Sequence, residues 1–176
     1  MIQQRQPEPC LHEGTTFPSP FTRVLALGYY DGPTNGLAQC GEDGPVYKFD
    51  LLDELYNPEG LDLRAFALAP APRNSLAELI TAYSPHLSPQ WPLWVPLWML
   101  PTKEIQQAME RVTDEVLGRA GAVEWILAAA DLLGELQAAR TVRPEELSAI
   151  TDWFAFLGIT HAAASGSGDT TKPESI

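Results

Sequence analysis

Cysteine is nearly absent from this chain: Cys10 and Cys40 are the only two in 176 residues. Two cysteines do not make the disulfide framework of a small secreted domain, so we expect a reducing compartment and a cytoplasmic location. Residues 1–20 lack the apolar core of a signal peptide. The longest apolar run, Trp91 to Pro101, contains three prolines and is too short to span a bilayer. The sequence therefore predicts a soluble protein with no membrane segment.

Basic residues are also scarce. Eleven lysines and arginines, scattered singly, stand against 23 aspartates and glutamates, which gives a formal net charge of −12. Nucleic-acid binding depends on neutralising phosphates with Lys and Arg, so this class of partner is not expected. Anionic membrane surfaces are disfavoured for the same reason.

Motifs of the common enzyme classes are missing as well. The chain has no P-loop and no dinucleotide-binding glycine fingerprint. The Ser and Gly residues near position 166 follow no strand and cannot form a nucleophile elbow. His12, His86 and His161 have no Ser or Cys nucleophile nearby in the sequence. No catalytic residue and no cofactor is therefore assigned.

A metal site is not expected either. The turn from Cys40 to Gly44 resembles the knuckle of a zinc ribbon, but Asp43 stands where that pattern has its second cysteine. Structural zinc requires four nitrogen or sulfur ligands at defined spacing. Adding Cys10 and His12 to Cys40 still leaves the set one ligand short.

Glycine-rich turns punctuate the first half of the chain. Two of them, Asp31 to Gly36 and Gly41 to Pro45, separate short apolar runs. Such runs, bounded by Gly, Pro, Asn and Asp, are typical of strands joined by tight turns. They predict a meander of four antiparallel strands at 23–30, 37–40, 46–52 and 61–69, with Asp50 paired to Arg64 across the last two strands.

Helical periodicity begins at Ser75, which forms a predicted capping box with Glu78. Apolar residues recur every three to four positions, which predicts helices at 76–83, 103–117 and 122–139 and a last one starting at Pro144. The third is apolar over much of its circumference, with a stripe of Trp125, Ile126, Ala129, Leu133 and Leu136, and should be central in the bundle.

The predicted fold is therefore α+β. An N-terminal antiparallel β-meander of about four strands (22–69) is followed by a C-terminal helical half of about four helices (75–158), and both share one core. Residues 21–160 form the single domain, after an extended proline-rich arm at 1–20. Residues 161–176, rich in Ala, Ser, Gly and Thr, cannot support a core and are predicted to be a disordered tail.

Two candidate binding sites stand out. Trp91, Trp94 and Trp98 alternate with prolines in a segment that cannot form a continuous helix. These indoles either pack into the core as an ordered crossover or form an exposed ridge that docks a protein partner; a platform for sugar stacking is a remoter alternative. The second candidate is a groove beside the first predicted turn, where hydrogen-bonding side chains gather: Tyr30, Asp31, Thr34 and Asn35. An ordinary turn capped by a tyrosine explains the same residues.

Two classes of function remain open. The first is a non-catalytic protein-interaction module, an adaptor or an inhibitor of a basic partner, that uses the Trp–Pro crossover. The alternative is a small-molecule-binding or hydrolytic protein with an acidic pocket at the junction of sheet and helices. That pocket should hold at least two convergent carboxylates with Tyr30 or His86 nearby. A homodimer through the apolar helix at 122–139 is compatible with either.

Overall fold

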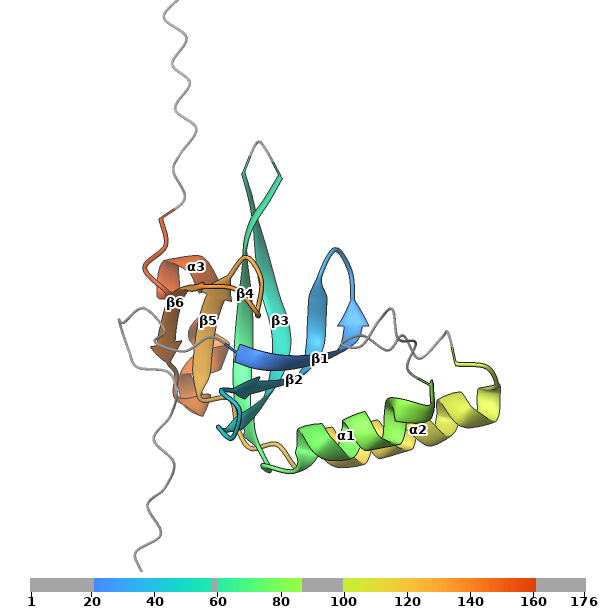
Figure 1. The fold of residues 1–176 in the computed structure, drawn as a ribbon. Helices are drawn as coiled ribbons and strands as arrows, with labels where there is room; N and C mark the ends of the chain where they lie inside the picture. Colours follow the sequence, from blue (N-terminus) through green and yellow to red (C-terminus); the bar gives the residue numbers. More distant parts are fainter. Residues whose placement is uncertain (1–20, 58–59, 87–99, 161–176) are drawn as a thin grey trace, which may run out of the picture.

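The structure, a computed structural model, describes residues 21–57, 60–86 and 100–160 (Figure 1). The predicted arm (1–20), the predicted tail (161–176) and the tryptophans Trp91, Trp94 and Trp98 lie outside this described part.

The centre of the fold is a six-stranded sheet in which every pair of neighbours is antiparallel and the strands follow chain order. Its strands are β1 (Phe21–Tyr29), β2 (Pro33–Cys40), β3 (Val46–Asn57), β4 (Gly60–Ala71), β5 (Trp125–Ala129) and β6 (Leu136–Thr141). Between β4 and β5 lie α1 (Ser75–Tyr83), the 3₁₀ turn η1 (Ser84–His86) and α2 (Lys103–Leu117). After β6 come the 3₁₀ helix η3 (Pro144–Ala149) and the short helix α3 (Trp153–Phe156).

The predicted order of four strands followed by four helices is wrong, although the chain is of the α+β class. The segment 122–139, expected to be the central helix, forms β5, a turn and the start of β6. Residues Trp125–Ala129 are buried on both faces of the sheet, and a strand covered on both faces has the same unbroken apolar pattern as a buried helix. The homodimer surface that was expected on this helix is lost with it.

The first four strands lie close to their predicted positions, and the glycine turns explain why. Gly36 has a φ of +155°, and a Cβ there would stand 1.9 Å from the carbonyl oxygen of Leu25 on β1, so only glycine allows this approach. The expected pair of Asp50 with Arg64 is wrong. A register shift after Leu51 places Arg64 opposite Glu54, while Asp50 forms an ion pair with Lys48 at 3.0 Å.

Helices α1 and α2 confirm two of the predicted helices. The Thr102 side chain caps α2 by accepting a hydrogen bond from the Ile105 amide. The predicted capping box on α1 is wrong, since Asn74 is the N-cap residue and its side chain makes no capping bond. The last predicted helix is divided into η3 and α3. Within the described ranges, no helix combines the length and the apolar character needed to cross a membrane.

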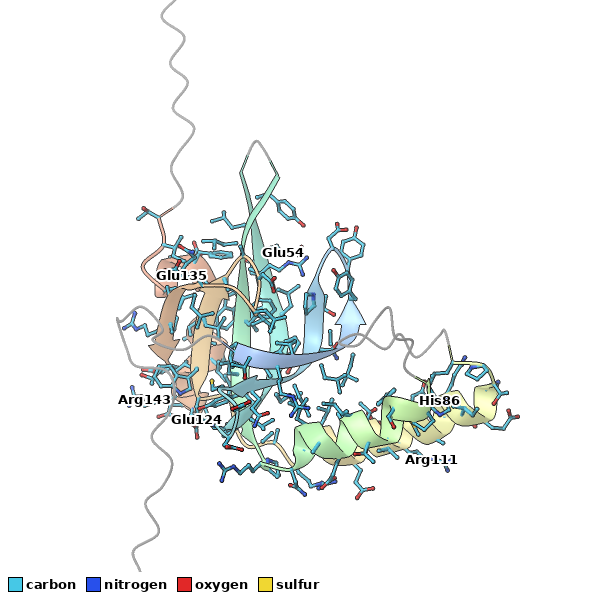
Figure 2. All side chains as sticks on the ribbon, viewed as in Figure 1. Glu54, His86, Arg111, Glu124, Glu135 and Arg143 are labelled. Carbon is cyan, nitrogen blue, oxygen red and sulfur yellow. The ribbon has the colours of Figure 1, made fainter. Side chains whose placement is uncertain are left out.

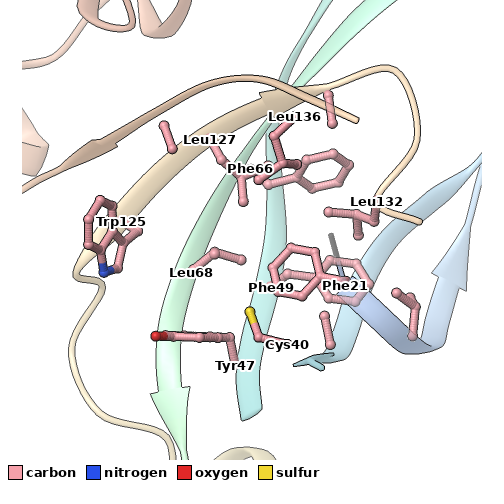
Figure 3. Close-up of a cluster of buried hydrophobic side chains, with 14 residues drawn as sticks. Phe21, Cys40, Tyr47, Phe49, Phe66, Leu68, Trp125, Leu127, Leu132 and Leu136 are labelled. Carbon is pink, nitrogen blue, oxygen red and sulfur yellow. The ribbon is translucent and has the colours of Figure 1, made fainter. Parts of the chain in front are cut away.

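The sheet curls around a hydrophobic cluster, shown in Figure 3, that collects side chains from all six strands. Phe49 and Phe66 meet edge to face at its centre, with ring centroids 5.9 Å apart. On the opposite face, α1 and α2 cover β1 to β3, while η3 and α3 cover β4 and β5. The helices therefore lie outside the curl, and the first and last hairpins approach each other across its open end.

Candidate binding site at the hairpin end of the sheet

An antiparallel meander places every second turn at the same end of the sheet. The β1–β2 turn (30–32), the ends of β3 and β4 at positions 57 and 60, and the β5–β6 turn (130–135) therefore lie toward the same end of the sheet, away from the end where α1 follows β4 (Figure 1). We call this end, with the strand residues next to its turns, the hairpin end.

The exposed large hydrophobic side chains of the described residues are all found at the hairpin end. They are Tyr29 (51% exposed), Tyr30 (71%), Tyr56 (55%) and Leu133 (40%). Carboxylates accompany them, since Asp31, Asp53 and Asp131 are exposed and Glu54 is half-buried. Figure 2 shows Glu54 and Glu135 toward the same end of the molecule.

A pocket of about 350 Å³ lies between the β1–β2 hairpin and the β5–β6 hairpin. Its walls are mostly apolar, with Val24, Ala26 and Pro33 on one side and Ala130 and Leu133 on the other. Two acidic residues, Asp31 and Asp131, and the aromatic residue Tyr29 also line it. The pocket exists because the sheet curls, since these hairpins belong to opposite edges of the strand order.

The turn that carries Asp31 has a demanding backbone. Asp31 has a φ of +50° and Gly32 a φ of +143°. Aspartate tolerates the left-handed region better than most residues, whereas a φ near that of Gly32 is a glycine conformation. A Cβ at Gly32 would also stand 2.3 Å from Nη1 of Arg64. Arg64 therefore packs directly beneath the turn.

Arg64 is 1% exposed and is the only fully buried charged residue among those whose side-chain burial the structure describes. Its Nη2 donates to the carbonyl oxygen of Tyr30 at 2.7 Å, and its Nη1 donates to that of Pro33 at 3.3 Å. Nη2 also lies 2.8 Å from Oε1 of Glu54, an ion pair without the alignment of a hydrogen bond. The guanidinium thus joins both ends of the β1–β2 turn to β3.

Glu54 extends this network to the surface. Its Oε2 accepts a hydrogen bond from the Tyr56 hydroxyl at 2.9 Å. This bond raises the pKa of Tyr56 above its usual 10.0, because it stabilises the protonated phenol beside a carboxylate. The phenol is therefore oriented by a network that begins at a buried arginine.

The structure brings together some of the predicted site residues and separates others. Asp31 lines the pocket, and Tyr30 is exposed on the adjoining turn. Thr34 and Asn35 do not line the pocket; their side chains lie over Gly28, where an added Cβ would be 2.3 Å from Asn35 Oδ1. Trp91, Trp94 and Trp98 are outside the described residues, so their candidate site stays a prediction.

Sequence reasoning missed Asp131, Leu133 and the network around Arg64. The helix expected at 122–139 assigned Leu133 to a buried stripe, whereas it stands exposed at the pocket. The available signal was Asp131 with Gly134 after a six-residue apolar run, which is typical of a strand followed by a turn. Nothing in the sequence indicated that Arg64 would be buried.

The other sequence candidates do not meet at this site. His86 lies in η1 on the helical side of the molecule, as Figure 2 shows, and it is not among the residues that line the pocket. Cys40 is buried in the sheet core. In the part of the chain that the structure describes, no three His, Cys, Asp or Glu side chains gather in a way that would hold a metal ion.

Comparisons with models of protein families, with curated proteins and with solved structures gave no match to this chain.

Proposed function

We propose that this protein is a non-catalytic protein-interaction module that binds its partner through the hairpin end. The observation that carries the proposal is that all four exposed large hydrophobic side chains of the described residues gather at this one end. Tyrosine supplies a large contact area together with a hydroxyl group, and it is enriched at the centres of protein interfaces. Three of the four side chains are tyrosines.

The charges of the same surface favour a basic partner. Asp31, Asp53 and Asp131 are exposed at the hairpin end, and the whole chain carries a formal net charge of −12. Complementary charge steers association and selects against acidic partners. An adaptor for a basic protein, or an inhibitor of one, fits this surface.

Trp91, Trp94 and Trp98 remain a second proposed contact for the same partner. Their spacing and their alternation with proline support this role, as Trp is enriched at interface hot spots.

Affinity capture from a lysate of the source cells, followed by mass spectrometry, tests the proposal. The baits are the wild-type protein, the double variant Tyr30→Ser/Tyr56→Ser, the variant Trp94→Ser, and a control, Glu104→Ser/Gln107→Ser, on the exposed face of α2. We expect a basic protein that the wild type and the control retain and the tyrosine variant loses. The same proteins on every folded bait would contradict the proposal, and loss from Trp94→Ser alone would assign the contact to the crossover.

Small-molecule binding is a second candidate, which the pocket between the hairpins favours. Two carboxylates and mostly apolar walls within about 350 Å³ are typical of a ligand site. A thermal-shift screen of metabolites tests it, and a ligand whose stabilising effect disappears in Leu133→Asp would support it. If no metabolite in the screen stabilises the protein, the result would count against this candidate.

A further inference from the structure

We infer that the pocket between the β1–β2 and β5–β6 hairpins receives one basic side chain, arginine or lysine, from the protein partner. This inference rests on the proposed function and specifies the chemistry of its central contact. It follows from the charge of the pocket, the character of its walls and the support of its turn.

The charge of the pocket is negative and is not neutralised from within the described structure. Asp31 and Asp131 line it, and neither forms an ion pair with a described lysine or arginine. The nearest buried cation, Arg64, faces Glu54 and two backbone carbonyls, so its charge is already compensated. The two aspartates therefore leave the pocket with an uncompensated charge that a cation would neutralise.

The walls suit the rest of a basic side chain. Arg and Lys carry an apolar stem of three or four methylenes below a charged group, and the stem gains from contact with apolar surface. Val24, Ala26, Pro33 and Leu133 supply that surface, and Tyr29, which also lines the pocket, carries an aromatic ring of the kind that attracts cations. An acidic ligand would be repelled by the two aspartates, and a purely apolar ligand would leave their negative charge uncompensated.

The turn that presents Asp31 is held in place before any ligand arrives. Arg64 donates to the carbonyls of Tyr30 and Pro33, on either side of Asp31 and Gly32. On the other hairpin, Oδ1 of Asp131 accepts the amide of Leu133 at 3.0 Å, which orients this carboxylate. Such preorganisation lowers the entropy lost on binding.

The test uses Nα-acetyl-arginine N-methylamide as the probe and its citrulline analogue as an uncharged isostere. Backbone amide shifts of the ¹⁵N-labelled full chain are recorded during titration with each compound. We expect saturable shifts at Gly32, Asp131 and Leu133 with the arginine compound, and none with the citrulline compound. Asp31→Asn and Asp131→Asn should each weaken binding about five-fold, the upper range for an exposed ion pair.

Both substitutions keep the local geometry. Asparagine tolerates the left-handed conformation of position 31, and at position 131 it keeps the oxygen that accepts the Leu133 amide. Glu135→Gln is the matched control, because it removes one charge from the same turn but does not line the pocket. Equal binding of the citrulline compound, or equal losses in all three variants, would overturn the inference.

Failure of the inference is distinguishable from failure of the proposed function. If the capture depends on Tyr30 and Tyr56 but not on Asp31 and Asp131, the interaction surface stands and the basic side chain does not enter the pocket. If the probe binds as expected but no protein is captured, the pocket recognises a free organic cation, and both the partner and its docking at this pocket are rejected.

Discussion

A buried arginine organises the hairpin end of this protein at the scale of single residues. Arg64 is held by two backbone carbonyls and by Glu54, whose side chain remains partly accessible. Removing water from a guanidinium is costly, and only its hydrogen bonds and the neighbouring carboxylate offset this cost. The stability of the β1–β2 turn therefore depends on both members of the pair.

Glu54→Ala should lower the free energy of unfolding by about 3 kcal/mol, because it leaves the buried charge of Arg64 without a counterion. Urea denaturation measures the loss. The matched control is Asp50→Ala, which breaks the exposed pair with Lys48 and should cost less than about 1 kcal/mol. Equal losses in the two variants would show that Arg64 is not buried as described.

The Tyr56 phenol reports on the same network. Its pKa is raised above 10.0 by the hydrogen bond to Glu54, so the bond stabilises the folded state below pH 10.0 and this contribution is lost as pH rises through the folded pKa. In Glu54→Gln we expect the pKa of Tyr56 to fall toward 10.0. A ¹³Cζ-tyrosine NMR titration measures it. Tyr83 is the internal control. Burial raises its pKa, and that pKa should be the same in Glu54→Gln as in the wild type.

At the scale of elements, α1 and α2 pack together as a pair through polar contacts as well as apolar ones. The hydroxyls of Tyr83 and Thr113 are 2.7 Å apart in the buried interface. Just after the C-cap of α2, Nη1 and Nη2 of Arg119 both donate to the carboxylate of Glu78 on α1. The two helices therefore cover the sheet as one unit.

The Glu78 contact should make this unit sensitive to acid. Its hydrogen bonds with Arg119 lower the pKa of Glu78 below 4.5, so its contribution to stability is present above pH 4.5 and is lost as pH falls through the lower folded pKa. We expect Glu78→Gln to be less stable than the wild type at neutral pH, with the difference vanishing in acid. Urea denaturation across this range measures it; a difference that persists at low pH would contradict the assignment.

The β5–β6 hairpin offers a direct test of strand against helix. Leu132 is 1% exposed and belongs to the sheet core, while its neighbour Leu133 is 40% exposed. Leu132→Ala should lower the free energy of unfolding by about 3 kcal/mol, whereas Leu133→Ala should stay within about 0.5 kcal/mol. Thermal or urea unfolding of the two variants decides the matter. A larger loss in Leu133→Ala than in Leu132→Ala would instead support the helix predicted at 122–139, whose apolar stripe contained Leu133.

At the scale of the whole molecule, excess negative charge surrounds a surface that we propose binds a basic partner. The formal net charge of −12 acts over distances set by the Debye length, which shrinks from about 30 Å at 0.01 M salt to about 8 Å at 0.15 M. Association with a basic partner should therefore depend on ionic strength through the rate of encounter.

We expect the association rate of an arginine-containing partner peptide to fall several-fold as salt rises over this range, with a smaller change in its dissociation rate. Stopped-flow or surface-plasmon kinetics measure both. The same peptide with citrulline in place of arginine is the control and should respond less to salt. A salt-independent association rate would argue against electrostatic steering.

The four N-terminal strands and the helices α1 and α2 were accessible from sequence because their signals are local. Gly36, Asn35 and the Gly41–Gly44 turn restrict the backbone over a few residues, and the apolar stripe of α2 repeats within its own length. The candidate site was only partly accessible. Asp31 could be singled out as a turn residue, but its partner in the pocket, Asp131, is a hundred positions away.

Local chemistry in the sequence therefore determined where the first four strands turn, which residues are apolar enough for a core, and that the protein is strongly acidic. Tertiary structure alone decided that Trp125–Ala129 is a strand, because pairing with β4 and burial on both faces outweigh the helix propensity of Ala and Leu. It also decided that Arg64 is buried and that Asp31 and Asp131 line the same pocket. Both follow from the curl of six paired strands, a long-range arrangement that no short stretch of sequence encodes.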